Sequence, residues 1–490
     1  MARVVALVAL VILLMVASAE IHVSALGVNW GNHAFNPLPP KDVVKLMQIN
    51  GIKKAKIFDA DYDMIRSMAG SGIEVMVAAP NNMLYSLAND PNAATAWVKQ
   101  NVTQFLFQGG VDIKWVAVGN EPFLTAYNNS YLNTTYPALR NIQTALDQAG
   151  HSEVRAIIPF NADVLTDSPK PSGSRFKPEY ISQIQPMLEI FNRTGAPFSV
   201  NLYPYISKYQ NPDFPLDYAF FSGTTSPNVD GTIVYQNALD ASLDGLITAL
   251  GAAGYPNMAV MLGEIGWPTD GAPFATVELA GRYMQDMITH LQSGVGTPLR
   301  PNSFTEFYLF GLLDENWKSI LPGPFERSWG VFYYDGIPKY PLNLNSGLTN
   351  LAATTLKALD YPPYMKAQFC VLNDAAVDKT NLTQNVQYAC ERSDCTALNP
   401  GSTCSMLTEN ASYAFNSYYQ SQNQDMNACD FQGFAKVVTT NPSQGLCRFP
   451  LSLVPTAKST SGASTLRLDS GVLALTLAAS LVSALWTMAG

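Results

Sequence analysis

Residues 116–122 read Val-Ala-Val-Gly-Asn-Glu-Pro, and residues 261–268 read Met-Leu-Gly-Glu-Ile-Gly-Trp-Pro. Each segment is an apolar run that ends abruptly on a glutamate, Glu121 or Glu264, and each is typical of a buried parallel strand. A carboxylate at the mouth of a buried strand is costly to desolvate, so its presence needs a reason. Two such strand ends predict a pair of carboxylates at one end of a parallel barrel.

Short apolar strands and amphipathic helices alternate from Leu26 to about Leu344. The predicted strands are Ala25–Val28, Ala55–Phe58, Glu74–Ala79, Lys114–Val118, Arg155–Pro159, Ser199–Leu202, Ala259–Leu262 and Glu306–Phe310. Helical patterns lie between them, among them Pro39–Asn50, Tyr131–Ala149, Pro178–Phe191 and Ile233–Gly251. Eight such units predict an α/β fold, a (β/α)8 TIM barrel. A doubly wound open sheet is the alternative, but Gly27–Asn32 lacks the spacing of a phosphate-binding turn.

The composition limits the class of partner. The chain has 490 residues, enough for two or three domains, and 38 acidic against 29 basic residues give a net charge of −9. An acidic chain without basic runs argues against nucleic acid and against anionic lipid surfaces as partners. A neutral polysaccharide is compatible with it.

The amino-terminal end has the pattern of a secretory signal peptide, assigned to residues 1–25. Arg3 precedes the apolar run Val4–Val16 and a small-residue segment, and cleavage after Ala19 or after Ala25 fits the pattern. A membrane-spanning helix is the alternative, but it would need about 20 apolar residues.

The carboxyl-terminal end has the three-part pattern of a glycosylphosphatidylinositol (GPI) anchor signal. A small-residue stretch is followed by a short polar spacer and then by the apolar run Val472–Gly490. We place the attachment at Ser461, with Gly462, Ala463 and Ser464 as rivals; residues 462–490 would then be removed. A permanent carboxyl-terminal membrane helix is the alternative.

Export is also indicated by sequons and cysteines. Six N-glycosylation sequons are present, at Asn101, Asn128, Asn133, Asn192, Asn381 and Asn410.

All six cysteines lie late in the chain and predict a disulfide framework in a module at residues 367–450. They are Cys370, Cys390, Cys395, Cys404, Cys429 and Cys447. A linker at 345–366 precedes this module, and a tail at 451–461 follows it. Zinc is a weak alternative because the module has no Cys-x-x-Cys pair and no histidine. The spacing leaves the pairing open among 15 possibilities.

Paired carboxylates are what glycosidic bond cleavage requires. One group protonates the departing oxygen, and in a retaining enzyme the other attacks the sugar carbon from the opposite side. Glu121 and Glu264 can fill these roles if their strands end close together. Asn120 could then bond a sugar hydroxyl, and Tyr203, Tyr205 and Trp267 could contact sugar rings, although core packing is the alternative for the aromatic residues.

A further charged cluster follows the eighth strand. Glu315 and Lys318 could form an ion pair that positions the nucleophile, with a solvated loop as the alternative. The four histidines lie in no nucleophile or metal-binding motif, and no P-loop or dinucleotide fingerprint occurs. We therefore expect no metal and no cofactor.

Five motifs in order resemble those of plant glycoside hydrolase family 17. They are Gly27–Gly31, Val118–Pro122, Asn201–Tyr205, Gly263–Pro268 and Asp314–Lys318, and the resemblance extends over residues 26–344. These enzymes are glucan endo-1,3-β-glucosidases with a (β/α)8 fold. The resemblance implies that Glu121 is the proton donor, Glu264 the nucleophile, and Glu315 and Lys318 supporting residues.

The cysteine-rich module resembles carbohydrate-binding module family 43, which binds β-1,3-glucan. The resembling segments are Phe369–Val371, Tyr388–Cys390, Asp394–Cys395, Tyr413–Gln420 and Cys447–Pro450. The resemblance implies a bridge between Cys370 and Cys429.

Together these features predict a monomeric enzyme, GPI-anchored to the outer face of the plasma membrane and facing the cell wall. It would cleave β-1,3-glucan internally by a retaining mechanism. The alternatives are a non-catalytic glucan-binding wall protein and a transglycosylase, which shares the covalent intermediate.

Overall fold

A computed structural model describes residues 26–303, 305–348, 351–375, 381–405 and 410–456. The predicted signal peptide, the predicted anchor residue Ser461 with its three rivals, and residues 462–490 lie outside these ranges. Within the described ranges, no helix combines the length and the apolar character needed to cross a bilayer.

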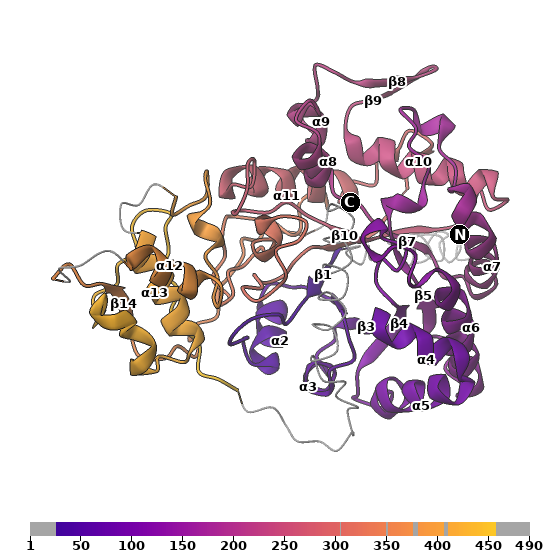
Figure 1. Ribbon diagram of the computed structural model, residues 1–490. Helices are drawn as coiled ribbons and strands as arrows, with labels where there is room; N and C mark the ends of the chain where they lie inside the picture. Colours follow the sequence, from indigo (N-terminus) through magenta and orange to yellow (C-terminus); the bar gives the residue numbers. More distant parts are fainter. Residues whose placement is uncertain (1–25, 304, 349–350, 376–380, 406–409, 457–490) are drawn as a thin grey trace, which may run out of the picture. The chain divides into compact units, whose positions relative to one another are not determined.

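A closed parallel barrel forms the larger part of the described chain (Figure 1). Its strands are β1 (Leu26–Trp30), β2 (Lys54–Ile57), β3 (Glu74–Ala79), β4 (Asp112–Val118), β5 (Arg155–Ile157), β6 (Pro159–Asn161), β7 (Phe198–Asn201), β10 (Val260–Ile265) and β13 (Glu306–Leu309). They pair in the order β5-β4-β3-β2-β1-β13-β10-β7-β6. Only Ile158 separates β5 from β6, so these two strands occupy one position and the sheet closes on itself. The predicted (β/α)8 class is confirmed.

Helices connect successive strands and cover the outside of the barrel (Figure 1). They are α2 (Pro40–Ile49), α3 (Tyr62–Ser67), α4 (Leu84–Asn89), α5 (Pro91–Asn101), α6 (Leu132–Gln148), α7 (Pro178–Thr194), α8 (Pro204–Gln210), α9 (Leu216–Ala219), α10 (Ala238–Ala252) and α11 (Val277–Gln292). Proline occupies the first turn of α2, α5 and α7, where its missing N–H costs nothing. The side chains of Asn237 and Thr276 cap α10 and α11.

The helix predicted over Ile233–Gly251 begins later than expected. Residues Ile233–Tyr235 form β9, which pairs with β8 (Asn228–Asp230) in an antiparallel hairpin. Asn237 then accepts a hydrogen bond from the Asp240 N–H and starts α10. The β-branched residues Ile233 and Val234 favour the strand, and the cap supplies the stop between the two elements. A second short hairpin pairs β11 (Gly296–Thr297) with β12 (Arg300–Pro301).

In the cysteine-rich module one helix packs on a two-stranded antiparallel sheet, and a second helix packs on the first. The strands are β14 (Phe369–Leu372) and β15 (Ala435–Val438), and the helices are α12 (Leu382–Cys390) and α13 (Asn410–Ser421). The six cysteines form the disulfides Cys370–Cys429, Cys390–Cys395 and Cys404–Cys447. The first of these is the bridge that the resemblance implied. The disulfides supplement two small apolar clusters that would be marginal alone.

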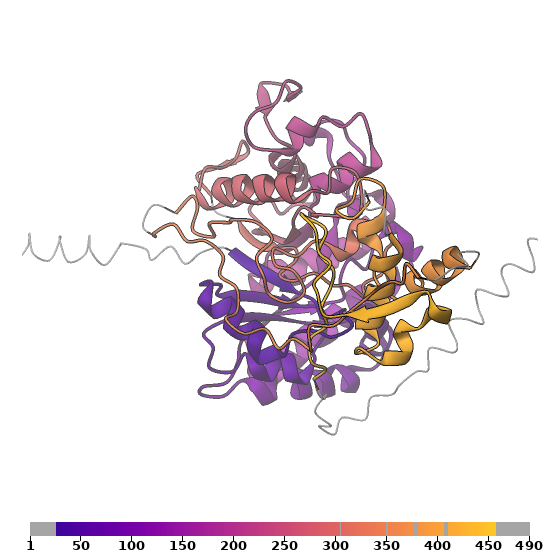
Figure 2. The same ribbon diagram turned by 90° about the vertical axis from the view of Figure 1, so that its left-hand side faces the viewer.

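The segments on either side of this module pack on the barrel. Leu359 from the predicted linker and Leu453 from the tail are buried in the barrel's apolar core. Tyr364 forms an isolated β-bridge with Leu453, and the Val454 N–H donates to the Pro363 carbonyl. The module is therefore held at both of its ends; its ribbons are orange and yellow in Figures 1 and 2.

Candidate active site

A sharp turn after β4 presents Glu121. Gly119 and Glu121 both adopt positive φ angles, 78° and 48°. A side chain at position 119 would meet Asn81 Oδ1 at 2.6 Å, so only glycine fits there. Glu121 is not a glycine, and its left-handed backbone costs about 1–2 kcal/mol. Such strain is typical of a functional site, and the bond from the Glu121 N–H to the Pro159 carbonyl (2.8 Å) holds it in place.

An irregularity in β10 presents Glu264. The pairing of β10 shifts register on both sides, between Leu262 and Glu264 against β7 and between Leu262 and Ile265 against β13. A bulge of this kind turns a side chain away from the alternation of a regular strand. The Leu202 N–H donates to the Glu264 carbonyl at 3.1 Å, which fixes the bulge against the neighbouring strand.

Two donors hold the Glu264 carboxylate. Lys56 Nζ, from β2, lies 2.6 Å from Oε1, and the Tyr203 hydroxyl donates to Oε2 at 2.5 Å. Lys56 is fully buried and also donates to Asn120 Oδ1 at 2.9 Å. Because one lysine bonds both Glu264 and the neighbour of Glu121, it ties the two glutamate-bearing strand ends together. A buried cation paired this closely orients the Glu264 carboxylate and offsets its negative charge.

The surroundings of Glu121 change the proton affinity of its carboxyl group. Burial of the Glu121 carboxyl group raises its pKa to about 7, and the negative charge of Glu264 adds to the effect. A hydrogen bond from Asn201 Nδ2 to Glu121 Oε1 (2.9 Å) and the charges of Lys56 and Lys318 oppose it. Glu121 therefore keeps its proton to a higher pH than an ordinary carboxyl group does. A raised pKa of this kind is what a general acid requires.

Tyr203 is the predicted aromatic residue that the structure brings to the carboxylates. Burial, followed by the charge of Glu264, raises the pKa of its hydroxyl well above the ordinary value. The hydroxyl therefore stays protonated and acts as a hydrogen-bond donor to Glu264. The residue as a whole is partly exposed, and its ring packs against Phe310 and Trp329.

Tyr205 and Trp267 do not line the site. Both side chains are fully buried in the barrel core. The Tyr205 hydroxyl donates to the Pro273 carbonyl, and Trp267 Nε1 donates to the Phe274 carbonyl. The rings pack on each other with centroids 5.2 Å apart. The prediction that they contact sugar is wrong, because a side chain with no exposed surface cannot touch a ligand.

The predicted ion pair between Glu315 and Lys318 is also corrected. Lys318 Nζ pairs with Glu326 at 2.7 Å, whereas Glu315 Oε1 accepts the His33 N–H at 3.0 Å. Nearby carboxylates, Glu326 first and then Glu315, raise the pKa of Lys318 although its burial opposes this. Glu315 packs where a Cβ on Gly31 would lie, so it joins the loop after β13 to the loop after β1. Both residues thus belong to the rim of the site: the Lys318 N–H donates to the Glu315 carbonyl at 3.0 Å, but the two side chains bond different partners.

Sequence reasoning missed Lys56, Asn201 and Glu326 as site residues. Lys56 offered a signal, because a lysine lies inside the otherwise apolar stretch Ala55–Phe58. Its partner lies 208 residues away, so the strand pattern alone could not name it. Within the described part of the chain, no group of three or more histidine, cysteine, aspartate or glutamate side chains is placed to hold a metal ion.

The six predicted glycosylation sites lie within the described residues. Five of the asparagines are exposed: Asn128, Asn133, Asn192, Asn381 and Asn410. Asn101 is partly buried, and its Nδ2 donates to the Trp97 carbonyl. The five exposed sites are accessible to a glycosylating enzyme, whereas Asn101 would first have to give up this hydrogen bond.

Comparison with known proteins identifies the family. The family described as "Glycosyl hydrolases family 17" matches residues 26–344, which contain the whole barrel and both glutamates. The chain belongs to glycosyl hydrolase family 17. An X8 domain matches residues 368–436, within the cysteine-rich module, which we call the X8 module from here on.

This family 17 protein has relatives of similar length. It is 47% identical over 443 residues to glucan endo-1,3-beta-glucosidase 8 of Arabidopsis thaliana, covering 89% of this chain and 91% of the relative. It is 44% identical over 448 residues to glucan endo-1,3-beta-glucosidase 5 of the same plant, covering 90% and 91%. Among solved structures, a β-1,3-glucanase and allergen of Cryptomeria japonica pollen is 36% identical, with a TM-score of 0.62. The match covers 66% of this chain and 99% of that one.

Proposed function

We propose that this family 17 hydrolase cleaves β-1,3-glucan at internal linkages by a retaining, double-displacement mechanism. The observation that supports this proposal most directly is the pair of glutamates at two strand ends, of which Glu121 has a pKa of about 7 and Glu264 is held by Lys56 and Tyr203. Relatives named glucan endo-1,3-beta-glucosidase, at 44–47% identity over most of the chain, support the choice of substrate.

In the first step Glu121 gives its proton to the glycosidic oxygen while the Glu264 carboxylate attacks the anomeric carbon. The carbon–oxygen bond to the leaving chain breaks, and a covalent glycosyl ester forms on Glu264. Negative charge leaves Glu264 as the ester forms. Lys56 and Tyr203 hold the attacking carboxylate in place before the step.

In the second step a water molecule replaces the leaving chain. Glu121, now ionised, takes a proton from this water as the water oxygen attacks the anomeric carbon. The ester bond breaks, Glu264 regains its negative charge, and Lys56 stabilises it again. Glu121 ends protonated, so the enzyme returns to its starting state with the configuration at carbon retained.

The X8 module would hold the enzyme on insoluble glucan and raise the local concentration of substrate. Three disulfides are typical of a chain that folds outside the reducing cytosol. We extend the proposal to export, glycosylation and GPI attachment at Ser461, which would place a monomeric enzyme at the outer face of the plasma membrane.

Product analysis over time tests the proposed activity. Protein secreted from a eukaryotic host should shorten laminarin chains, and Glu264→Ala should abolish this while glucan binding persists. Products that grow longer with time would show that the enzyme is a transglycosylase and not a hydrolase. Binding without any change in chain length would leave a glucan-binding protein, and full activity of Glu264→Ala would remove the assigned nucleophile.

A further inference from the structure

The segment after β13 carries charged residues to the catalytic face. Lys318 and Glu326 form an ion pair in which the two side chains are only 25% and 10% exposed. The charge of Lys318 acts on Glu121, and Glu264 in turn acts on Lys318. The position of this pair therefore contributes to the electrostatic environment of both catalytic glutamates.

Arg327 braces this segment from behind. Its Nε donates to the Lys318 carbonyl at 2.8 Å, across nine residues of chain. It follows Glu326 directly, at the end of the short helix η6 (Pro324–Arg327). A shift of Arg327 would therefore move both members of the Lys318–Glu326 pair.

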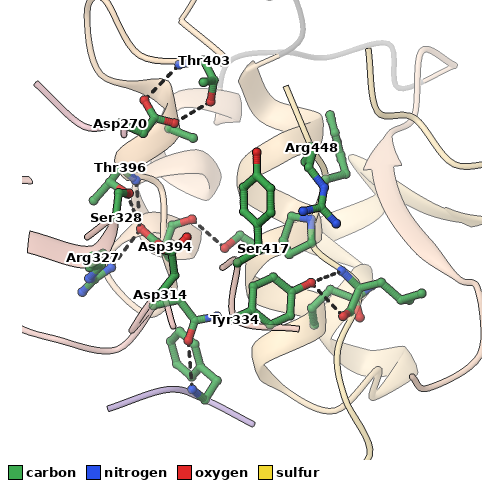
Figure 3. Close-up of a pocket in the computed structure, with 18 of the residues that line it drawn as sticks. Asp270, Asp314, Arg327, Ser328, Tyr334, Asp394, Thr396, Thr403, Ser417 and Arg448 are labelled. Carbon is green, nitrogen blue, oxygen red and sulfur yellow. Dashed lines mark hydrogen bonds and ion pairs between the residues drawn. The ribbon is translucent and has the colours of Figure 1, made fainter. Parts of the chain in front are cut away.

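The outer end of Arg327 is held by the X8 module. Its Nη1 donates to Asp394 Oδ1 at 3.2 Å (Figure 3). It also donates to the Ser393 carbonyl at 3.4 Å. The two side chains of the ion pair are 13% and 20% exposed, so water screens the pair less than it would at a fully exposed site. In Figure 3 Arg327 reaches toward Asp394, which also faces Thr396.

Asp394 is itself rigidly placed. It lies next to Cys395, whose disulfide to Cys390 closes a loop with a sequence separation of only five. The Thr396 N–H and hydroxyl both donate to Asp394 Oδ1, at 3.0 and 2.8 Å, and the Ser417 hydroxyl donates to the Asp394 carbonyl at 2.7 Å. The Asp394 carboxylate, which accepts the bond from Arg327, is thus held in place by the module before the module docks on the barrel.

Further bonds prevent the module from moving away. Asp270, just after the Gly266–Pro268 end of the nucleophile motif, accepts both the N–H and the hydroxyl of Thr403 (Figure 3). Arg448 pairs with the buried carboxylate of Asp335 at 3.1 Å. The Tyr334 hydroxyl donates to the Leu451 carbonyl, and the Leu451 N–H donates back, both at 2.9 Å. The module is docked through specific polar contacts as well as through its two chain connections.

From these contacts we infer that the X8 module is a positioning element of the catalytic centre. Through Asp394 and Arg327 it holds residues 314–327 so that the Lys318–Glu326 pair keeps its place beside Glu121 and Glu264. This inference rests on the proposed function. It gives the X8 module an effect on the chemical step that is separate from any binding of glucan.

The test compares two charge-neutralising variants of the module in the full-length protein. Asp394→Asn removes the charge that Arg327 meets but keeps an oxygen for Thr396. Glu391→Gln, the matched control, removes a charge only three residues away, from the exposed pair with Arg392. Activity is measured on soluble laminarin oligosaccharides, so that attachment to an insoluble polymer does not contribute. Unchanged melting temperatures and intact disulfides verify folding.

We expect Asp394→Asn to lower kcat by about three- to tenfold with KM changed less than about twofold, because the defect is one of positioning. In Asp394→Asn, Lys318 is held less firmly, so its positive charge lowers the pKa of Glu121 by a smaller amount. The alkaline limb of the pH–activity profile should therefore move to higher pH in Asp394→Asn and stay in place in Glu391→Gln.

Amide hydrogen exchange gives a readout that needs no activity. Exchange over residues 314–327 should be faster in Asp394→Asn than in the control. If wild-type protein cleaves glucan and the two variants match in kcat, pH profile and exchange, the inference fails and the proposed function stands. If wild-type protein is inactive while exchange still rises in Asp394→Asn, the proposed function fails and the mechanical link remains.

Discussion

Lys56 shows how one residue can connect two elements of a site. It is buried in β2 and bonds both Glu264 and Asn120. An unpaired buried carboxylate would be costly, and the ion pair with Lys56 offsets that cost for Glu264. The same strand carries Lys54, which pairs with Glu74 at the amino end of β3 and with Glu306 at the amino end of β13. Two lysines separated by one residue thus serve opposite ends of the barrel.

Replacement of Lys56 by Met should lower kcat on laminarin by about 10²-fold or more, because the nucleophile loses its ion-pair partner. Lys54→Met is the matched control, since it removes the same side chain from the same strand at the end remote from the glutamates. Its kcat should stay within about twofold of wild type. Equal activity of the two variants would show that Lys56 has no role in the reaction.

The raised pKa of Glu121 predicts the pH dependence of the reaction. As the proposed proton donor, Glu121 must be protonated, so kcat/KM should fall as the pH rises through about 7. A profile that stays flat to pH 9 would show that this group does not donate the proton.

The same shift predicts a change in stability with the opposite sign to that of an ordinary salt-bridged carboxylate. The folded-state pKa lies above the unfolded one, so the folded state binds more protons between pH 4.5 and about 7. The stability that the Glu121 carboxyl group contributes is present below pH 4.5 and is lost as the pH rises through 7. Thermal melts should show Glu121→Gln gaining stability over wild type at pH 8 but not at pH 4.5.

At the scale of the element, the bulge in β10 decides where Glu264 points. Gly263 is required there, because a Cβ would lie 2.7 Å from both Asn201 Oδ1 and Ser199 Oγ on the rigid neighbouring strand. The apolar pattern of residues 259–262 predicted the strand but not the bulge, since nothing local in the sequence signals a register shift. The predicted strands otherwise lie within about two residues of those observed.

Gly263→Ala should destabilise the protein by about 1–3 kcal/mol and remove most of the activity, because the bulge must move to admit the methyl group. Gly251→Ala provides the contrast within helix α10, where the nearest atom would be Pro256 Cβ at 3.9 Å. There the change should stabilise by about 0.5–1 kcal/mol. Chemical denaturation of both variants measures these differences, and an active Gly263→Ala would show that the bulge tolerates a side chain.

At the scale of the whole molecule, residues after the X8 module complete the core of the barrel. Leu453 is fully buried in that core, although more than 140 residues separate it from β13. The motif order indicated two modules and a linker, but it could not indicate that the linker and the tail both pack on the barrel. Such packing depends on surfaces that exist only after both modules have folded.

Leu453→Ala should lower the free energy of unfolding by about 2–5 kcal/mol, as the truncation of a buried leucine does. The neighbouring Val454 is 48% exposed, so Val454→Ala should change the free energy of unfolding by less than about 0.5 kcal/mol. Denaturant titration followed by tryptophan fluorescence compares the two. Matching midpoints would indicate that the tail is not part of the barrel core.

The sequence by itself determined the barrel class, the two glutamates at strand ends and the disulfide-rich module. These follow from apolar periodicity, strand length and residue spacing, which act over a few residues. Tertiary structure alone decided that Lys56 meets Glu264, that Lys318 pairs with Glu326, and that Tyr205 and Trp267 are buried. Those outcomes depend on which side chains closure of the sheet and docking of the module bring together from distant parts of the chain. No local pattern encodes that choice.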